Sequence, residues 1–298
     1  MPELPDVTVY VEQLLPRVVG QPLLGIRLAS SFVLRSVSPP LQEAYGKTVS
    51  DVRRVGKRVV LALEGELFLV IHFMIAGRFR WRAQDAKSPG KLAHAALDFP
   101  PGTLLLTEAG TKKRASLRLL HGDAALAEID PGGLEVLETD ERGFREVLLS
   151  ENHTLKRALT DPRLFSGIGN AYSDEILHRA KLSPLKQAHH LSESEVASLF
   201  AATRETLLNW TENLRRHAGD GFPETVTAFH NGMAVHGRYQ QPCPVCGAPV
   251  QRIVYAENEV NYCPRCQTDG RLRADRALSR LLKADWPRNL EELSARRK

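Results

Sequence analysis

The four cysteines form two CxxC pairs, Cys243/Cys246 and Cys263/Cys266, separated by 16 residues. This spacing is typical of a four-thiolate zinc site, in which each pair supplies two sulfurs from one tight turn. A single Zn²⁺ ion would be structural there, because four thiolates leave no open position for catalysis. The alternatives are a pair of disulfides, which a reducing compartment disfavours, and four unrelated core cysteines.

Composition excludes several classes of protein. The chain is 43% hydrophobic and 25% charged, which argues against a disordered, collagen-like or disulfide-stapled chain. No apolar run approaches the roughly 18 residues of a spanning helix, and the first residues lack the pattern of a secretory signal. We therefore expect no membrane association and a cytoplasmic, bacterial-type location. The net charge of +5 permits a polyanionic partner without demonstrating one.

Hydrophobic periodicity divides the chain into a strand-rich first part and a helical second part. A stripe over residues 6–15 predicts a short helix that ends at Pro16. Ser192 and Glu195 have the spacing of a capping box, which predicts where a long helix begins. The first part predicts an antiparallel sandwich or barrel. The predicted strands are 59–63, 67–73, 78–81, 95–99, 103–107 and 116–120, and the other predicted helices are 141–150, 155–160, 171–180, 193–217 and 274–282.

A glycine turn precedes one of these helices. Gly167-Ile168-Gly169-Asn170 lies directly before the helix predicted at 171–180. Glycines let backbone amides turn outward, and a helix N-terminus attracts anions, so the turn could hold a phosphate with Asn170 as an extra donor. The alternative is an ordinary helix cap.

The N-terminus offers a nucleophile. Removal of Met1 would expose the secondary amine of Pro2 beside the carboxylate of Glu3. An α-amine has a pKa near 7.7–8.0, so a useful fraction is neutral and nucleophilic at pH 7. Such an amine can attack an aldehyde-like sugar carbon and form an iminium. The alternative is an N-terminal residue without a chemical role.

These features, in this order from residue 2 to about 267, resemble the formamidopyrimidine-DNA glycosylase / endonuclease VIII family. The resemblance is carried by Pro2-Glu3-Leu4-Pro5, Lys57 in Gly56-Lys57-Arg58, His72-Phe73 with Gly77, the run Gly167-Ile168-Gly169-Asn170-Ala171-Tyr172, and Val235-His236-Gly237-Arg238 before the cysteines.

The resemblance implies an α+β, two-domain fold. An antiparallel β-sandwich with a leading helix would be followed by a helical domain with a helix–two-turn–helix and a four-cysteine zinc finger. The expected boundaries are 1–132 for the sandwich, 133–238 for the helix–two-turn–helix domain, 239–267 for the finger and 268–298 for a basic helical extension. The expected protein is a monomer that acts on damaged double-stranded DNA at the nucleoid.

The resemblance also implies a mechanism of base-excision repair. Pro2 would displace the damaged base and form an iminium, Glu3 would protonate the sugar ring oxygen, and β,δ-elimination would cut the strand. The implied catalytic residues are Pro2, Glu3 and Lys57, with Lys57 on a phosphate beside the lesion. The implied DNA-binding residues are His72, Ile75, Lys156, Gly169, Asn170 and Arg265. Base chemistry of this kind requires a nucleotide flipped from the duplex.

Several positions depart from the family pattern. Asp6 replaces a common glutamate, and Ile75 replaces the methionine that fills the space left by the flipped base. The stretch 108–116 contains no aromatic wedge, and the finger hairpin carries Glu257 and Glu259 where an arginine is usual. A finger contact to DNA would then come from Asn258, Asn261 or Arg265. We therefore expect an altered lesion spectrum.

The residues after the fourth cysteine form an additional basic segment. Residues 267–298 carry nine Lys/Arg and five Asp/Glu, so +4 of the net charge of +5 belongs to them. We expect their helix to pack against the finger or the helical domain, and we expect their cations to replace phosphate contacts that the finger lacks. Two other functions remain open: a non-catalytic protein that binds damaged DNA on the same scaffold, and a zinc-ribbon regulator outside repair.

Overall fold

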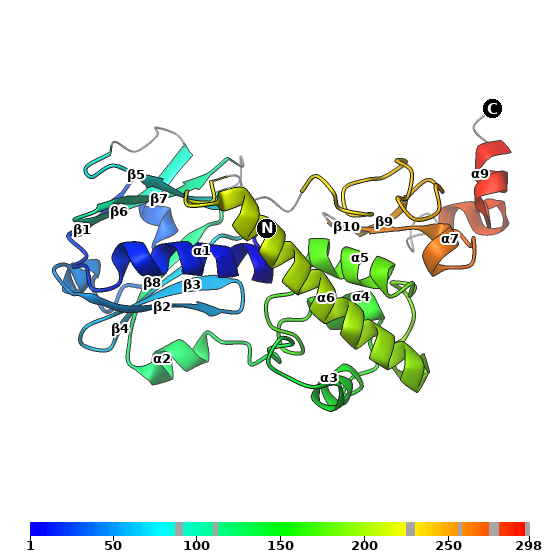
Figure 1. Ribbon diagram of the computed structural model, residues 1–298, viewed down its shortest axis with the longest axis horizontal. Helices are drawn as coiled ribbons and strands as arrows, with labels where there is room; N and C mark the ends of the chain where they lie inside the picture. The colour runs from blue at the N-terminus through cyan, green and yellow to red at the C-terminus, as the bar shows by residue number, and fades with distance from the viewer. Residues whose placement is uncertain (87–91, 110–112, 225–229, 256–257, 274–279, 296–298) are drawn as a thin grey trace. The chain divides into compact units, whose positions relative to one another are not determined.

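The computed structural model describes residues 1–298 except 87–91, 110–112, 225–229, 256–257, 274–279 and 296–298 (Figure 1). The chain divides into two compact units. The first unit comprises Met1–Gly133 and Leu207–Ala228, and the second comprises Leu134–Thr206 and Phe229–Lys298. No helix within the described ranges is long and apolar enough to cross a membrane.

The first unit is an antiparallel β-sandwich. One sheet has the strand order β1-β6-β7-β5 and the other has the order β2-β3-β4-β8, with every pairing antiparallel. The sandwich predicted from the sequence is therefore confirmed. The strands are β1 (Gly25–Leu28), β2 (Val49–Val55), β3 (Arg58–Leu63), β4 (Leu67–His72), β5 (Gly77–Arg82), β6 (Ala93–Phe99), β7 (Gly102–Glu108) and β8 (Ser116–His121).

Helix α1 (Leu4–Val18) opens the first unit and packs on β2 and β3. Its Tyr10 is fully buried between the two sheets, where its ring stacks on Phe73 at 5.1 Å and meets the edge of Phe79 at 5.3 Å. The Phe79 backbone N–H donates to the Tyr10 hydroxyl, so the phenol is satisfied inside the core. The predicted end of this helix at Pro16 is wrong. Proline removes only one backbone donor, and the apolar face continues to the buried Val18.

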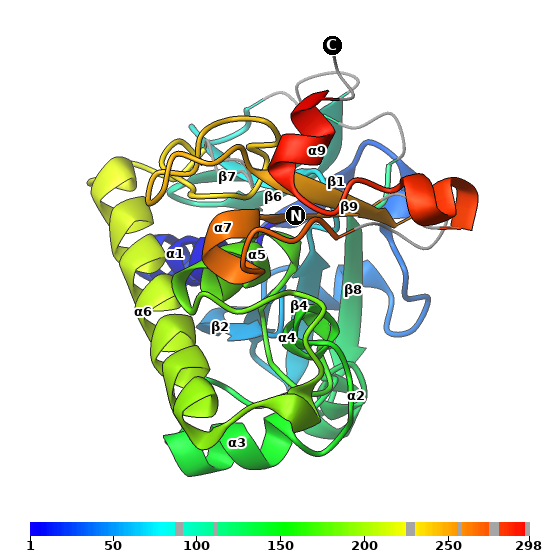
Figure 2. The ribbon, with the colours of Figure 1, turned by 90° about the vertical axis from the view of Figure 1, so that its right-hand side faces the viewer.

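Short elements complete the first unit. The structure adds strands β1 and β2, the short helices η1 (Ser31–Val33) and η2 (Leu41–Ala44), and α2 (Asp123–Glu128) to the elements expected from the sequence. Helix α2 lies at the C-terminal end of β8 and covers part of the outer face of the second sheet through Leu126 (Figure 2). At six residues, α2 is too short for a periodic pattern to reveal it.

The second unit is helical and carries the finger. Its first helix begins at a cap, because the Asp140 side chain accepts from the Gly143 N–H. The predicted capping box of the long helix is confirmed: the Ser192 N–H donates to the Glu195 carboxylate at 2.8 Å. The helices are α3 (Glu141–Leu148), α4 (Leu155–Thr160), α5 (Asn170–Arg179), η4 (Ala188–His190) and α6 (Glu193–Ala218). The last part of α6, from Leu207, belongs to the first unit. The finger contains β9 (Gln251–Tyr255), β10 (Asn258–Tyr262) and α7 (Pro264–Gln267).

The segment after the finger folds back onto it. The Leu272 N–H donates to the Arg288 carbonyl at 2.8 Å, and Leu290 packs against the apolar cluster around the cysteines. The contact with the finger is made by α9 (Leu290–Ala295), a helix that the sequence did not predict and that follows η5 (Lys283–Asp285). Most of the helix predicted at 274–282 lies outside the described residues, and only residues 280–282 are seen as helical.

Candidate active site and nucleic-acid interface

A capping box at the start of α1 fixes the first residues of the chain. The Glu3 N–H donates to the Asp6 carboxylate at 2.8 Å, and the Glu3 side chain accepts from the Asp6 N–H in return. Both carboxylates are buried, with 1% and 0% exposure. Each side chain thus accepts a backbone N–H at the start of the helix. The shorter side chain of Asp6 is long enough for this role.

Charged groups surround the α-amine of Met1. Burial lowers the pKa of this amine below its usual value, and the positive charges of Arg78 and Lys57 lower it further. The carboxylates of Glu3 and Asp6 act in the opposite direction. Of the residues implied by the resemblance, the structure thus brings Glu3 and Lys57 close enough to the chain terminus to influence its protonation.

Arg78 is a site residue that the sequence analysis missed. It follows Gly77 at the start of β5, and burial lowers the pKa of its guanidinium. Gly77 has to be glycine, because a Cβ there would lie 2.4 Å from the Phe73 carbonyl oxygen. The close turn from Phe73 to Gly77 directs the chain into β5. An arginine directly after a required glycine was the available sequence signal.

His72 directly precedes this turn, and Ile75 lies within it. His72 ends β4, where burial and the nearby Arg58 and Lys57 lower the pKa of its imidazole to about 4. The ring is therefore neutral at pH 7. Ile75 is 55% exposed, and Met74 before it adopts the left-handed conformation at φ 51°. The predicted contact of Ile75 with DNA stays a prediction.

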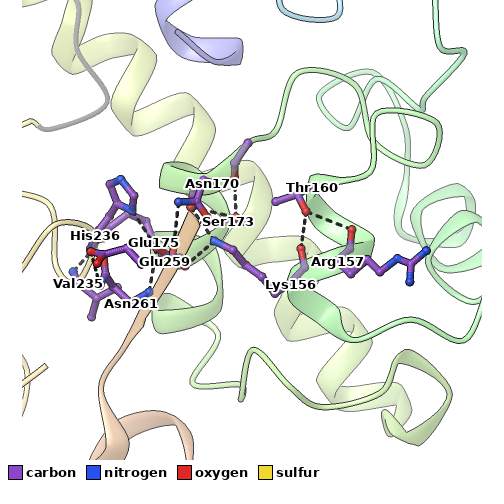
Figure 3. Close-up of polar contacts among 12 residues, drawn as sticks. Lys156, Arg157, Thr160, Asn170, Ser173, Glu175, Val235, His236, Glu259 and Asn261 are labelled. Carbon is purple, nitrogen blue, oxygen red and sulfur yellow. Dashed lines mark hydrogen bonds and ion pairs between the residues drawn. The ribbon is translucent and has the colours of Figure 1, made fainter. Parts of the chain in front are cut away.

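The glycine turn of the second unit leads into α5, with Gly169 as N-cap and Asn170 as the first helical residue. The Asn170 side-chain amide donates to the Glu259 carbonyl of β10 at 2.9 Å (Figure 3). The side chain of Asn170 was predicted to donate a hydrogen bond to a DNA phosphate. In this structure its amide connects the turn to the finger hairpin.

Lys156 lies beside this turn in a buried ion pair. Its Nζ donates to the Asn170 carbonyl at 2.7 Å and to the Asp174 carboxylate at 2.5 Å (Figure 3). Asp174 is 1% exposed, lies 2.8 Å from His236 Nδ1, and accepts from the Asn261 N–H. One carboxylate on α5 therefore connects α4, the segment before the finger, and β10.

The neighbouring Glu175 anchors the segment before the finger. Its carboxylate accepts the backbone N–H groups of residues 234, 235 and 236 at 2.7 to 2.9 Å (Figure 3). Burial raises the pKa of Glu175, and the three N–H donors counteract this effect. The sequence analysis missed both carboxylates. An acidic pair within a helix full of buried residues was the signal that could have revealed them.

The four thiols of the finger converge. Their sulfurs lie within 4.8 Å of one another, with 3.4 Å between Cys246 and Cys263. Tetrahedral Zn–S bonds of ~2.3 Å require sulfurs ~3.8 Å apart, so the four side chains fit one metal ion. Burial raises the pKa of Cys263 and Cys266, so a cation would stabilise the thiolate forms. The site is a structural metal centre.

The finger hairpin uses its polar groups internally. Glu259 pairs with Arg252 at 3.2 Å, and Arg252 lies 4.3 Å above the Tyr239 ring. The Asn261 amide bonds the Gly237 N–H and the Glu259 carboxylate. Arg265 donates to the Cys246 carbonyl. Asn261 and Arg265, both predicted to contact DNA, thus hold the finger together, and the Asn258 side chain lies outside the described residues.

The predicted site residues fall into two groups. Pro2, Glu3, Lys57, His72 and Ile75 belong to the first unit. The second unit contains Lys156, Gly169, Asn170, Arg265 and the four cysteines. In the first group, Glu3 and Lys57 act on the chain terminus, and the second group includes a helix start and a metal centre.

Comparisons with known proteins agree with this division. Family models match the formamidopyrimidine-DNA glycosylase N-terminal domain at residues 1–114, its H2TH domain at 133–215 and the zinc finger found in FPG and IleRS at 240–268. The formamidopyrimidine-DNA glycosylase of Thermus thermophilus is 34% identical over 284 residues, which cover 91% of this chain and 100% of that protein.

Two further relatives extend the comparison. A formamidopyrimidine-DNA glycosylase-like protein of Mycobacterium tuberculosis is 40% identical over 155 residues, covering 52% of this chain and 94% of that protein. A solved complex of the Lactococcus lactis Fpg with DNA containing an abasic site superposes with a TM-score of 0.78 at 28% identity, covering 89% and 99% of the two chains.

A β-sandwich led by a capped helix, followed by helices and a four-thiol finger, defines a DNA glycosylase and abasic-site lyase of base-excision repair. The chain belongs to the formamidopyrimidine-DNA glycosylase family. The resemblance seen in the sequence is thereby confirmed.

Proposed function

We propose that the chain, once Met1 is removed, excises damaged bases through the amine of Pro2. The observation that carries the proposal is the charged setting of the chain terminus. In the structure, burial lowers the pKa of the Met1 α-amine, Arg78 and Lys57 lower it further, and Glu3 and Asp6 act in the opposite direction. We expect the same surroundings to favour a neutral, nucleophilic amine on Pro2, the next residue. Two buried carboxylates lie on the adjacent residues of the same helix start.

The proposed reaction uses these groups in sequence. The Pro2 nitrogen attacks C1′ of a flipped nucleotide, the bond to the base breaks, and the base leaves with its electron pair. Glu3 protonates the ring oxygen, so the sugar opens as an iminium on Pro2. Loss of the 3′ phosphate and then the 5′ phosphate by β,δ-elimination cuts the strand, and water releases Pro2.

The substrate is damaged double-stranded DNA, bound by a monomer. Lys57 and His72 would contact phosphates near the lesion, and Ile75 would occupy the space that the flipped base leaves. In the second unit, Lys156, Gly169 and Asn170 would contribute at the start of α5. Complexes of the Lactococcus lactis relative contain abasic-site, Fapy-dG and oxidised-pyrimidine DNA, which supports abasic sites and oxidised or ring-opened bases as the substrate class. The metal ion would be Zn²⁺.

The decisive experiment combines intact mass with borohydride trapping. Mass spectrometry should find the mature protein without Met1, and borohydride should trap a covalent complex with abasic-site DNA. Pro2→Gly should abolish the trapped complex, whereas Pro5→Ala, which changes a proline in the first turn of α1, should retain it. A protein that keeps Met1, or that gives no adduct with any damaged oligonucleotide, would favour the non-catalytic DNA-binding alternative.

A further inference from the structure

The second sheet carries two arginines that the proposed reaction does not use. In the strand register, Arg58 on β3 lies directly opposite His72 on β4, and His72 lies directly opposite Ser116 on β8. Arg118 on β8 lies opposite Val70 on β4, two residues along each strand from Ser116 and His72. Directly paired residues and residues two apart on a strand project to the same face of a sheet. Arg58, His72 and Arg118 therefore share one face at one end of the sheet.

This face is the outer one. The intervening residues, such as Val59, Ile71 and Leu117, belong to the core between the sheets. On the outer face, the next residues of β3 and β4 are apolar (Val60, Ala62, Phe68 and Val70), and Leu126 of α2 packs against them. Arg58 and Arg118 thus border an otherwise apolar, packed surface.

The two guanidinium groups repel each other. Burial and the charge of Arg118 lower the pKa of Arg58, and Asp130 is the single carboxylate that opposes this effect. Within the described part of the chain, neither guanidinium makes a hydrogen bond or ion pair. Like charges placed together on a sheet destabilise it, and a bound anion removes the repulsion.

We propose that Arg58 and Arg118 form an anion site beside His72, and that the site takes a phosphate of the DNA backbone. The proposal rests on the proposed function for the identity of the ligand. Two guanidinium forks and a neutral imidazole supply donors of the kind that bind phosphate oxygens. The site would extend the DNA contacts of the first unit beyond the residues that the sequence implied.

The test is the salt dependence of binding to a duplex that contains an uncleavable abasic-site analogue. Arg58→Gln and Arg118→Gln should each weaken binding, and the double variant should reduce the slope of log affinity against log salt by about 0.9 for each phosphate that the protein no longer neutralises. Arg142→Gln is the matched control, because Arg142 is an exposed arginine of the second unit paired with Glu146. An unchanged slope in the double variant would overturn the proposal.

Two further measurements separate this inference from the proposed function. Inorganic phosphate should shift the imidazole resonances of His72 in the wild-type protein and leave them unchanged in the double variant, a result independent of DNA binding and of Pro2. Removal of either arginine should also leave the Tm unchanged or raise it, since a repulsion is relieved. A lower Tm combined with an unchanged phosphate titration would assign the arginines a structural role and contradict the proposal.

Discussion

The molecule contains two helix N-termini surrounded by charged residues, and they use those charges differently. At α1, Glu3 and Asp6 cap the helix while the adjacent terminal amine has a lowered pKa. At α5, Lys156 and Asp174 neutralise each other in a buried pair. The first arrangement favours loss of a proton from the terminal amine, as nucleophilic attack by an amine requires. The second arrangement connects segments and favours a fixed geometry.

The difference follows from what surrounds each site. The carboxylates at α1 are satisfied by the backbone of the same short segment. At α5, the single carboxylate of Asp174 bonds groups from three other segments, and the Asn170 amide adds a bond to β10. We infer that a substitution at the start of α5 should destabilise several segments of the second unit, whereas a substitution at the start of α1 should mainly affect the reaction.

Removal of the metal should give the largest effect. Structural zinc contributes on the order of 10 kcal/mol to small metal-dependent folds. Stripping the metal with a chelator should therefore unfold the finger and release β10, which carries both Glu259 and Asn261. Limited proteolysis should show new cleavage within 240–268 and continued protection of the first unit.

The same experiment can break the comparison. Cleavage of the first unit on the same time scale would mean that the metal supports both helix N-termini. Re-addition of Zn²⁺ should restore the original proteolytic pattern, and Mg²⁺ should not, because four thiolates select a soft metal.

Breaking the buried ion pair should give the next largest effect. Asp174→Asn would leave the Lys156 ammonium buried without its counter-charge, which costs about 3 kcal/mol of unfolding free energy. Glu146→Gln is the control, because Glu146 and Arg142 form a pair with both side chains exposed, and such pairs contribute about 1 kcal/mol or less. Urea denaturation measures both values.

The double variant Lys156→Met/Asp174→Asn sharpens this result. Removing the ammonium as well should restore part of the stability that Asp174→Asn loses, since that loss comes from the unpaired ammonium. If Asp174→Asn were as stable as the wild type, the Lys156 ammonium would have to be stabilised by another partner or by water once Asp174 loses its charge. The two helix starts would then be less different than the structure indicates.

Local patterns made much of the fold and of the metal centre predictable. The strands of the sandwich show β-branched runs between turn residues, and the cysteine spacing is a local signal. α2 was missed because six residues are too few for helical periodicity. The end of α1 was misplaced because burial of Val18 outweighs the one backbone donor that Pro16 removes.

The candidate site was predictable only where its residues act close to one another in sequence. Pro2 and Glu3 are adjacent, and the glycine turn is continuous. Asp174 was missed because its partners, Lys156, His236 and Asn261, lie 18 to 87 residues away. The alternative uses of Asn261 and Arg265, which bond the finger itself, were hidden for the same reason.

The smallest effect should come from the first unit and should depend on pH. The pKa of His72 is lowered to about 4 in the folded state, whereas an unfolded histidine keeps its usual value near 6.5. Between these pH values the unfolded chain binds a proton that the folded chain excludes, so unfolding free energy should fall as the pH decreases from 6.5 to 4. The loss should reach about 2 kcal/mol after allowance for partial exposure.

His72→Gln isolates this contribution, because glutamine keeps a polar side chain without titrating. The wild-type stability should decline more steeply than that of the variant from pH 6.5 to 4, and the two curves should run parallel above pH 7. Parallel curves throughout would mean that neither burial nor the nearby cations disfavour the charged imidazole. A steeper wild-type curve would show that burial, together with Arg58, Lys57 and Arg118, keeps His72 neutral in the folded first unit, in contrast to the paired charges at α5.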